Sequence, residues 1–157
     1  MFDLEFLDSL FVIWAFLFQL ILIIHFALRR WRFDQAIKRG TWVYALCLPA
    51  VALSIILLSA GKPWSLWVGG FIYLAWAVYG YTVEYVRHIQ WRSPARWSIL
   101  VPYVLLYLAT VMFYWWPLAL IFKPLWYGYA LLFLISTLLN VTSHQKKDQL
   151  VLKEALK

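Results

Sequence analysis

Five runs of apolar residues constrain this chain more than any other feature of its sequence. They cover residues 9–28, 42–60, 65–86, 97–116 and 125–142. A helix of about 20 apolar residues crosses the roughly 30 Å hydrocarbon core of a bilayer. Because hydrocarbon offers no partner to an open strand edge, each run is expected to be helical. The sequence therefore predicts an all-α integral membrane protein, in which residues 1–157 form a single bundle of five transmembrane helices.

The composition supports this class and excludes a soluble domain. Of the 157 residues, 65% are hydrophobic and 13% are charged, whereas a soluble domain carries about 25% charged residues. The net charge of +7 does not indicate nucleic-acid binding, because the basic residues stand at the boundaries of the apolar runs. The single cysteine, Cys47, lies inside a run, so the chain has neither an intrachain disulfide nor a CxxC metal or redox site.

Arginine and lysine predict the orientation of the bundle. Five basic residues follow the first run, three follow the third and four lie in the tail, whereas the other side carries Lys62 and Lys123. All three basic segments fall on one side when five spans are threaded through a membrane, and such segments face the cytoplasm. We expect an external N-terminus, a cytoplasmic basic tail at 143–157 and insertion into the bacterial cytoplasmic (inner) membrane. The stretch 117–124 is too short to cross and is bracketed by prolines, so we expect an interfacial or shallow re-entrant turn there.

Glu84, Arg87 and His88 stand where the third run ends. In a helix they are three and four residues apart and share a face. One interpretation is structural, a helix end with an ion pair between Glu84 and Arg87. The other is functional, because an enzyme at the membrane interface could use these three residues as its catalytic groups.

Three histidines stand at the inner ends of odd-numbered runs and are expected at similar depth: His25, His88 and His144. Imidazole and carboxylate groups suit zinc or iron. No His-x-x-His or Glu-x-x-His spacing accompanies them, so they are only weak candidates for metal ligands. The runs contain almost no ionisable residue at mid-membrane depth, which argues against ion translocation.

Most of the tryptophans fall at the boundaries of the runs, where such rings commonly anchor a helix at the membrane interface. These are Trp31, Trp42, Trp64, Trp67, Trp91, Trp97, Trp115, Trp116 and Trp126. Trp14 and Trp76 lie deeper. We expect an aromatic belt at each interface.

The third run carries the candidate ligand-binding and helix-packing residues. Trp76 is the better ligand candidate, and the polar tips of Tyr73, Tyr79 and Tyr81 accompany it. Small residues let membrane helices approach closely, and this run has three: Gly69, Gly70 and Gly80. We therefore expect the third span to be the central helix of the bundle or its contact with a partner.

Two short stretches resemble known families. "GKPW" with "WVGGFIYLAWAVYGY" resembles the loop-and-span motif of the tryptophan-rich sensory (translocator) proteins, which bind tetrapyrroles and sterols, although in that family the loop precedes the second span. "EYVRH" resembles the start of the cofactor motif of isoprenylcysteine-type membrane methyltransferases, although Ile89 stands where that motif has proline. Each match is short and lacks part of its motif, so we assign the chain to neither family.

Together these patterns favour a non-enzymatic role. The chain is expected to be an accessory or structural subunit of a membrane complex, or a binder of a flat apolar ligand such as a tetrapyrrole, a quinone, a sterol or another lipid. The expected partners are membrane lipids, other membrane-protein subunits, a second copy of the chain or a hydrophobic small molecule, and the sequence names no cofactor. The alternative is an enzyme that acts on a lipid or isoprenoid at the cytoplasmic face.

The charge distribution makes the topology testable. In a Cys47→Ser background, Lys38→Cys is expected to resist a membrane-impermeant thiol reagent added to intact cells, because the segment 29–40 faces the cytoplasm. Lys62→Cys is the matched control and is expected to react. Labelling of Lys38→Cys from the outside would contradict the predicted orientation.

Overall fold

The computed structural model describes residues 5–89 and 95–155, with side chains placed for all of these except 33, 34, 36–39 and 144–155. Helices joined by short turns make up nearly all of the described chain. They are α1 (Phe6–Trp31), α2 (Phe33–Ala45), α3 (Cys47–Ser59), α4 (Trp64–Tyr81), the π-helix η1 (Thr82–Val86), α5 (Trp97–Ile121) and α6 (Lys123–Ala155).

Within the described ranges, five helical segments are long and apolar enough to cross a membrane. These segments are Phe6–Trp31, Gly40–Ser59, Trp64–Val86, Trp97–Ile121 and Lys123–Ser143. The prediction of an all-helical chain with five spans is confirmed at the level of helix length and composition.

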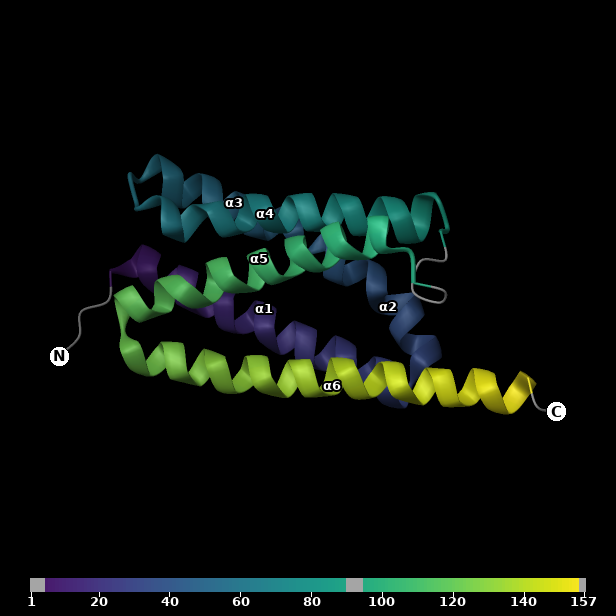
Figure 1. The fold of residues 1–157 in the computed structure, drawn as a ribbon. Coiled ribbons are helices and arrows are strands. Elements are labelled where there is room, and N and C mark those ends of the chain that lie inside the picture. The colour runs from purple at the N-terminus through teal and green to yellow at the C-terminus, as the bar shows by residue number, and fades with distance from the viewer. Residues whose placement is uncertain (1–4, 90–94, 156–157) are drawn as a thin grey trace.

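Helix α4 lies between α3 and α5, and α1 packs against α6. Figure 1 shows α3 and α4 along one edge of the bundle, α1 and α6 along the opposite edge and α5 between them. The centre of the core is aromatic: the ring of Phe18 on α1 lies 4.9 Å from the ring of Tyr73 on α4 and 5.0 Å from the ring of Tyr114 on α5, measured between centroids. The core therefore sits where α1, α4 and α5 meet.

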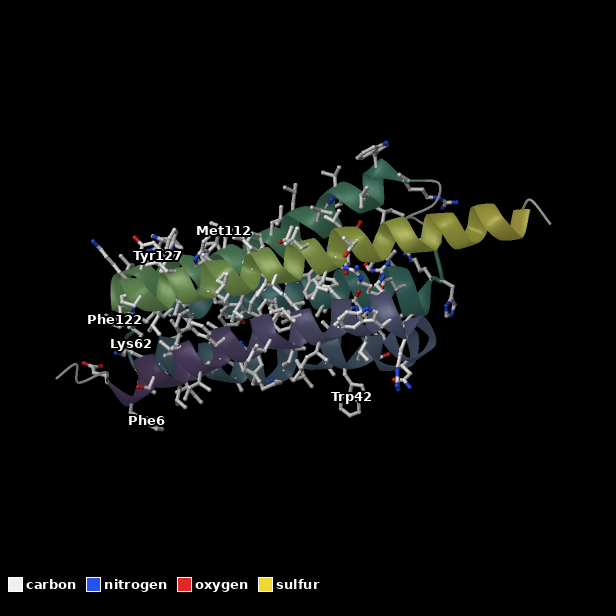
Figure 2. All side chains as sticks on the ribbon, turned by 90° about the horizontal axis from the view of Figure 1, so that it is seen from below. Phe6, Trp42, Lys62, Met112, Phe122 and Tyr127 are labelled. Carbon is white, nitrogen blue, oxygen red and sulfur yellow. The ribbon has the colours of Figure 1, made fainter. Side chains whose placement is uncertain are left out.

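Successive spans run in opposite directions, so the connections gather at two ends of the bundle (Figure 1). Phe6, Lys62 and Phe122 lie together at one end (Figure 2), which we call the N-terminal end. The end of α1, the end of η1 and the start of α5 lie at the other, the C-terminal end. The described basic residues follow the same division, with Lys62 and Lys123 at the N-terminal end and five arginines at the C-terminal end: Arg29, Arg30, Arg32, Arg87 and Arg96.

The second span bends at Leu46, where α2 gives way to α3. Pro49 accounts for the break, because proline lacks the N–H that would donate to the Ala45 carbonyl and its ring clashes with that carbonyl in a straight helix. Helix ends leave carbonyl groups without partners. One of those at this break, the carbonyl of Val43, accepts a hydrogen bond from the Tyr73 hydroxyl on α4. The bend thus ties the second span to α4.

The predicted interfacial or re-entrant turn at 117–124 is wrong for most of that stretch. Helix α5 continues through Pro117 to Ile121, and α6 begins at Lys123. Proline is tolerated inside membrane helices when neighbouring helices cover the backbone that it disturbs, and Pro117 is fully buried. Phe122 alone separates the two helices, so the last two spans form a tight helical hairpin. The tail has a helical backbone, because α6 extends to Ala155. The basic segment after the first span is helical too, since it forms the start of α2.

Gly70 permits the closest approach between α3 and α4. A Cβ atom built on Gly70 would clash with the Ser54 hydroxyl and would lie 2.6 Å from the Ala50 backbone oxygen. Because the backbone of α3 cannot move aside as a flexible side chain can, these two helices pack at this distance only with glycine at position 70. Gly69, on a neighbouring face, would place a Cβ 3.3 Å from side-chain atoms of Phe113 and Tyr114 on α5.

We predict that Gly70→Ala destabilises the bundle by roughly 1–3 kcal/mol, the usual effect of overpacking. The matched control is Gly128→Ala, whose Cβ would lie 3.6 Å from the Phe16 ring in ordinary contact. That change should be neutral or stabilising, because alanine favours a helix more than glycine does. Thermal unfolding in detergent measures both; equal melting temperatures for Gly70→Ala and the wild type would contradict the α3–α4 packing.

A charged contact closes the N-terminal end. The Lys62 ammonium group, in the turn between α3 and α4, donates to a carboxylate oxygen of Glu5 and lies 2.8 Å from a carboxylate oxygen of Asp8. The hydrogen bond and the charge of Lys62 lower the pKa of Glu5, and the hydrogen bonds to Asp8 and Glu5 raise the pKa of Lys62. The indole N–H of Trp67 donates to the Lys62 carbonyl at 3.2 Å, which holds the turn against α4. This contact fastens the start of α1 to the α3–α4 turn.

The contact predicts a specific pH dependence. Because the pKa of Glu5 is lower in the folded protein, its stabilising effect is complete above the usual glutamate value of about 4.3 and is lost as the pH falls through the folded pKa. Glu5→Gln should therefore lower the melting temperature by about 1–3 °C near pH 7, and the difference from the wild type should vanish near pH 3. A difference that persists unchanged at pH 3 would show that the Lys62–Glu5 pair does not act through charge.

Candidate functional site

The candidate site lies at the C-terminal end of α4, where the helix changes its winding. Residues Thr82–Val86 form a π-helix, and the Arg87 N–H donates to the Thr82 carbonyl at 2.9 Å, five residues back. π-Helical turns are rare and occur frequently at functional sites. The wider winding changes the directions of the side chains that follow α4, including that of Glu84.

Glu84 is half-buried and accepts a hydrogen bond from Tyr44. The Tyr44 hydroxyl lies 2.8 Å from Glu84 Oε2 and 3.2 Å from the Tyr103 hydroxyl. The three residues come from η1, α2 and α5, so one hydrogen-bonded group joins three helices. Gly80 makes this possible, because a Cβ there would lie 2.7 Å from the Tyr44 ring.

Trp76 lies directly beneath this group, inside an aromatic cluster. Its side chain is 3% exposed, and its ring centroid lies 5.5–5.8 Å from the rings of four tyrosines: Tyr44, Tyr73, Tyr103 and Tyr107. The indole Nε1 is buried and has no hydrogen-bonding partner among the residues that the structure describes. The cluster therefore offers an unused donor surrounded by flat apolar faces.

A chain of touching rings leads from this cluster to the surface. Tyr81 is 42% exposed and stacks on Tyr85 with centroids 5.3 Å apart. Tyr85 lies 6.1 Å from the Tyr44 ring, and Tyr44 lies 5.7 Å from Trp76. We call these four residues the aromatic track; it extends from an exposed position on α4 to the buried indole.

A close contact near the track brings α1 into the site. A Cβ built on Gly40 would lie 2.6 Å from the Tyr85 hydroxyl and 3.8 Å from His25 Cε1. Glycine at position 40 thus lets α2 pass between His25 on α1 and Tyr85 on η1. His25 also packs edge-on against Phe26, with centroids 5.6 Å apart.

The candidate residues predicted from the sequence do not all lie in one site. Trp76 and Tyr73 are together in the cluster, whereas the Tyr79 hydroxyl donates to the Ile99 carbonyl on α5 at 3.3 Å. Arg87 and His88 are exposed. His88 has a left-handed backbone with φ of 47°, so helical spacing does not extend from Glu84 to His88.

The structure adds no support for a metal site at the histidines. Among the described residues, no group of three or more His, Cys, Asp or Glu side chains is placed so that it could hold a metal ion. The side chain of His144 lies outside the described residues, as does Trp91.

The tryptophans at the ends of the runs differ in exposure. The rings of Trp31, Trp42, Trp64, Trp97 and Trp116 are exposed, and Figure 2 shows Trp42 projecting from the bundle. Trp115 instead stacks on Trp126 with centroids 5.0 Å apart and donates its N–H to the Trp126 carbonyl at 3.0 Å. That pair joins α5 to α6.

Sequence reasoning missed the tyrosines that complete the site: Tyr44, Tyr85, Tyr103 and Tyr107. One signal could have found Tyr44 and Tyr103. Each is a polar-tipped residue near the start of its span, which lies at the same end of the bundle as Glu84. Comparison with known proteins adds no assignment, since no family model, curated protein or solved structure gives a significant match to the chain.

Proposed function

We propose that this chain is a non-enzymatic integral membrane protein that binds a flat apolar ligand against the aromatic cluster around Trp76. The candidate ligand classes are a tetrapyrrole, a quinone, a sterol and other lipids. The proposal places the bundle in the bacterial cytoplasmic membrane with its C-terminal end toward the cytoplasm, because the basic residues gather at that end.

The buried, unpaired indole N–H of Trp76 is the observation that carries this proposal. A buried donor without a partner costs about 1–3 kcal/mol, and a ligand that carries an acceptor, such as a carbonyl oxygen, a hydroxyl oxygen or a ring nitrogen, would remove that cost. Flat rings would stack on the tyrosine faces around the indole at the separations that aromatic pairs prefer.

The aromatic track supports a route for such a ligand. Membrane-soluble molecules reach a helix bundle from the lipid, and Tyr81 is exposed on that side. Rotation of the stacked Tyr81 and Tyr85 rings would open the way to Tyr44 and Trp76. Glu84 lies beside the track, where its carboxylate accepts a hydrogen bond from the Tyr44 hydroxyl and fixes the orientation of that ring.

Purification in mild detergent, followed by solvent extraction and mass spectrometry, is the first test. The purified protein is then titrated with a protoporphyrin, a short-chain quinone and a sterol. For the ligand class that binds, Trp76→Phe should weaken binding about tenfold, because one buried hydrogen bond is lost.

Trp14→Phe is the matched control for this titration. Trp14 is also buried with an unpaired indole N–H, but it is not part of the aromatic track. Equal weakening by both changes, or no effect of Trp76→Phe, would contradict the site. Stoichiometric co-purification of other membrane subunits, with no binding of any of the three ligands, would favour the role of an accessory subunit.

An enzyme acting on a lipid or isoprenoid is the second candidate function. The observation in its favour is the half-buried carboxylate of Glu84 in a π-helical turn, hydrogen-bonded to two tyrosines in series. Such a carboxylate could serve as a general base at the membrane interface. The exposed Arg87 and His88 would then contact a phosphate-bearing headgroup.

Glu84→Gln separates the two functions. The amide oxygen can still accept the Tyr44 hydroxyl, so we expect the melting temperature and the ligand affinity to stay close to those of the wild type. The measurement compares the lipid composition of cells that lack the protein with that of the same cells expressing the wild type or Glu84→Gln. A lipid change that the wild type restores and Glu84→Gln does not would favour the enzyme; full restoration by Glu84→Gln would exclude Glu84 as its catalytic base.

A further inference from the structure

A contact between α1 and α6 places an arginine at the end of two spans. The Arg30 guanidinium donates from Nη1 to the Thr142 hydroxyl oxygen at 2.7 Å. Arg30 lies in the last turn of α1, and Thr142 lies one residue before the end of the apolar stretch Lys123–Ser143 of α6. Both side chains are half-buried. The guanidinium therefore lies where α1 meets α6, at the C-terminal end of the bundle.

Thr142 orients the arginine without neutralising it. The Thr142 hydroxyl donates to the Leu138 carbonyl on its own helix at 2.7 Å, so its proton is used there while its oxygen accepts from Arg30. Among the described side chains, the ion pairs are those of Lys62 at the opposite end of the bundle, and none includes Arg30. A guanidinium has several N–H donors, and this contact uses one of its nitrogens. The charge and the remaining N–H groups are left for a partner outside the chain.

The surface beside this contact is apolar toward the middle of the bundle. Leu138 lies one helical turn before Thr142, on the same face of α6, and is 66% exposed. Trp31, which follows Arg30, is 67% exposed, and indole rings at the end of a span lie at the level of the lipid headgroups. An amphiphile whose apolar chains cover Leu138 would therefore bring its headgroup to Arg30.

The charge at this end of the bundle favours an anionic headgroup. The sequence has five basic residues and one acidic residue in 29–40, three and one in 84–96, and four and two in 143–157. Guanidinium groups bind phosphate through paired N–H donors, and basic sites between membrane helices bind anionic lipid headgroups. A zwitterionic phospholipid carries an ammonium group of its own, so it gains less from the surplus of positive charge.

We propose that the Arg30–Thr142 contact is the headgroup site of a bound anionic phospholipid, whose phosphate accepts from the Arg30 guanidinium and whose acyl chains cover Leu138. The lipid covers part of the span that the bundle itself covers least, since 11% of the residues in the most apolar stretch of α6 are buried. The site is built by α1 and α6, whereas the rings around Trp76 come from α2, α4 and α5. Lipid binding here is therefore independent of the ligand proposed for Trp76.

Native mass spectrometry of the full-length protein in detergent tests the site, because it resolves each bound lipid. Titration with phosphatidylglycerol and with phosphatidylcholine of the same acyl chains should show a first phosphatidylglycerol that binds about fivefold to tenfold more tightly. Arg30→Gln should remove most of this preference, since it removes the charge and keeps a hydrogen-bond donor for Thr142. Arg96→Gln is the matched control, because Arg96 is an exposed arginine at the same end, and it should leave the preference nearly unchanged. Equal binding of the two lipids by the wild type, or equal loss of the preference in both variants, would overturn the proposal.

Photo-cross-linking locates the lipid in the wild-type protein, so it does not depend on the folding of a variant. Phosphatidylglycerol with a diazirine in its acyl chain should label α6 near Leu138 more than α5 near Leu105, a leucine of similar exposure at 61%. Equal labelling of the two helices would show general contact with lipid and would overturn the proposal. Millimolar inorganic phosphate should leave the labelling unchanged, because it has no acyl chains; displacement of the lipid by phosphate would show an ion site instead of a lipid site.

Discussion

Helix α4 can pack closely against α3 because the two helices meet at Gly70, a position with no side chain. The backbone oxygen of Ala50 lies 2.6 Å from the place that a Cβ on Gly70 would take, so the distance between these helices is set by backbone contact. That distance lets Tyr44, on α2, lie over Gly80 and reach Glu84. The aromatic cluster and the hydrogen-bonded group above it thus depend on close packing of helices that lipid alone would not drive together.

Two prolines shape the ends of the spans in opposite ways. Pro49 breaks the second span, and the carbonyl of Val43 at that break binds the Tyr73 hydroxyl of α4. Pro117 leaves α5 unbroken because it is buried among neighbouring helices. Proline therefore interrupts the second span but lies within the continuous helix α5. The difference lies in how the neighbouring helices pack around each proline rather than in the local sequence.

This contrast explains how much could be predicted from the sequence. Hydropathy located all five spans to within a few residues, because the length of a span depends on local composition. The predicted turn at 117–124 was wrong for most of its length, since the prediction rested on the shortness of the stretch and on its two prolines. The Tyr44–Glu84 hydrogen bond joins residues 40 positions apart, and no local pattern specifies such a pair. The π-helix at Thr82–Val86 is equally hidden, because it arises where α4 must adjust to α2 and α5.

The polar tips inside this bundle favour bound molecules over a purely structural core. Phenylalanine in place of Tyr114 or Tyr129, which are both fully or almost fully buried, would fill nearly the same space and leave no polar atom in an apolar interior. Each unpaired polar atom costs about 1–3 kcal/mol, which is a large fraction of the 5–15 kcal/mol that typically stabilises a folded protein. Among the residues that the structure describes, the buried polar atoms without a partner include the indole nitrogen of Trp76 and the amide oxygen of Gln19. A stable fold that contains the buried Trp76 donor is most simply explained if a partner outside the chain satisfies it, which is the place that the flat ligand takes in the proposed function.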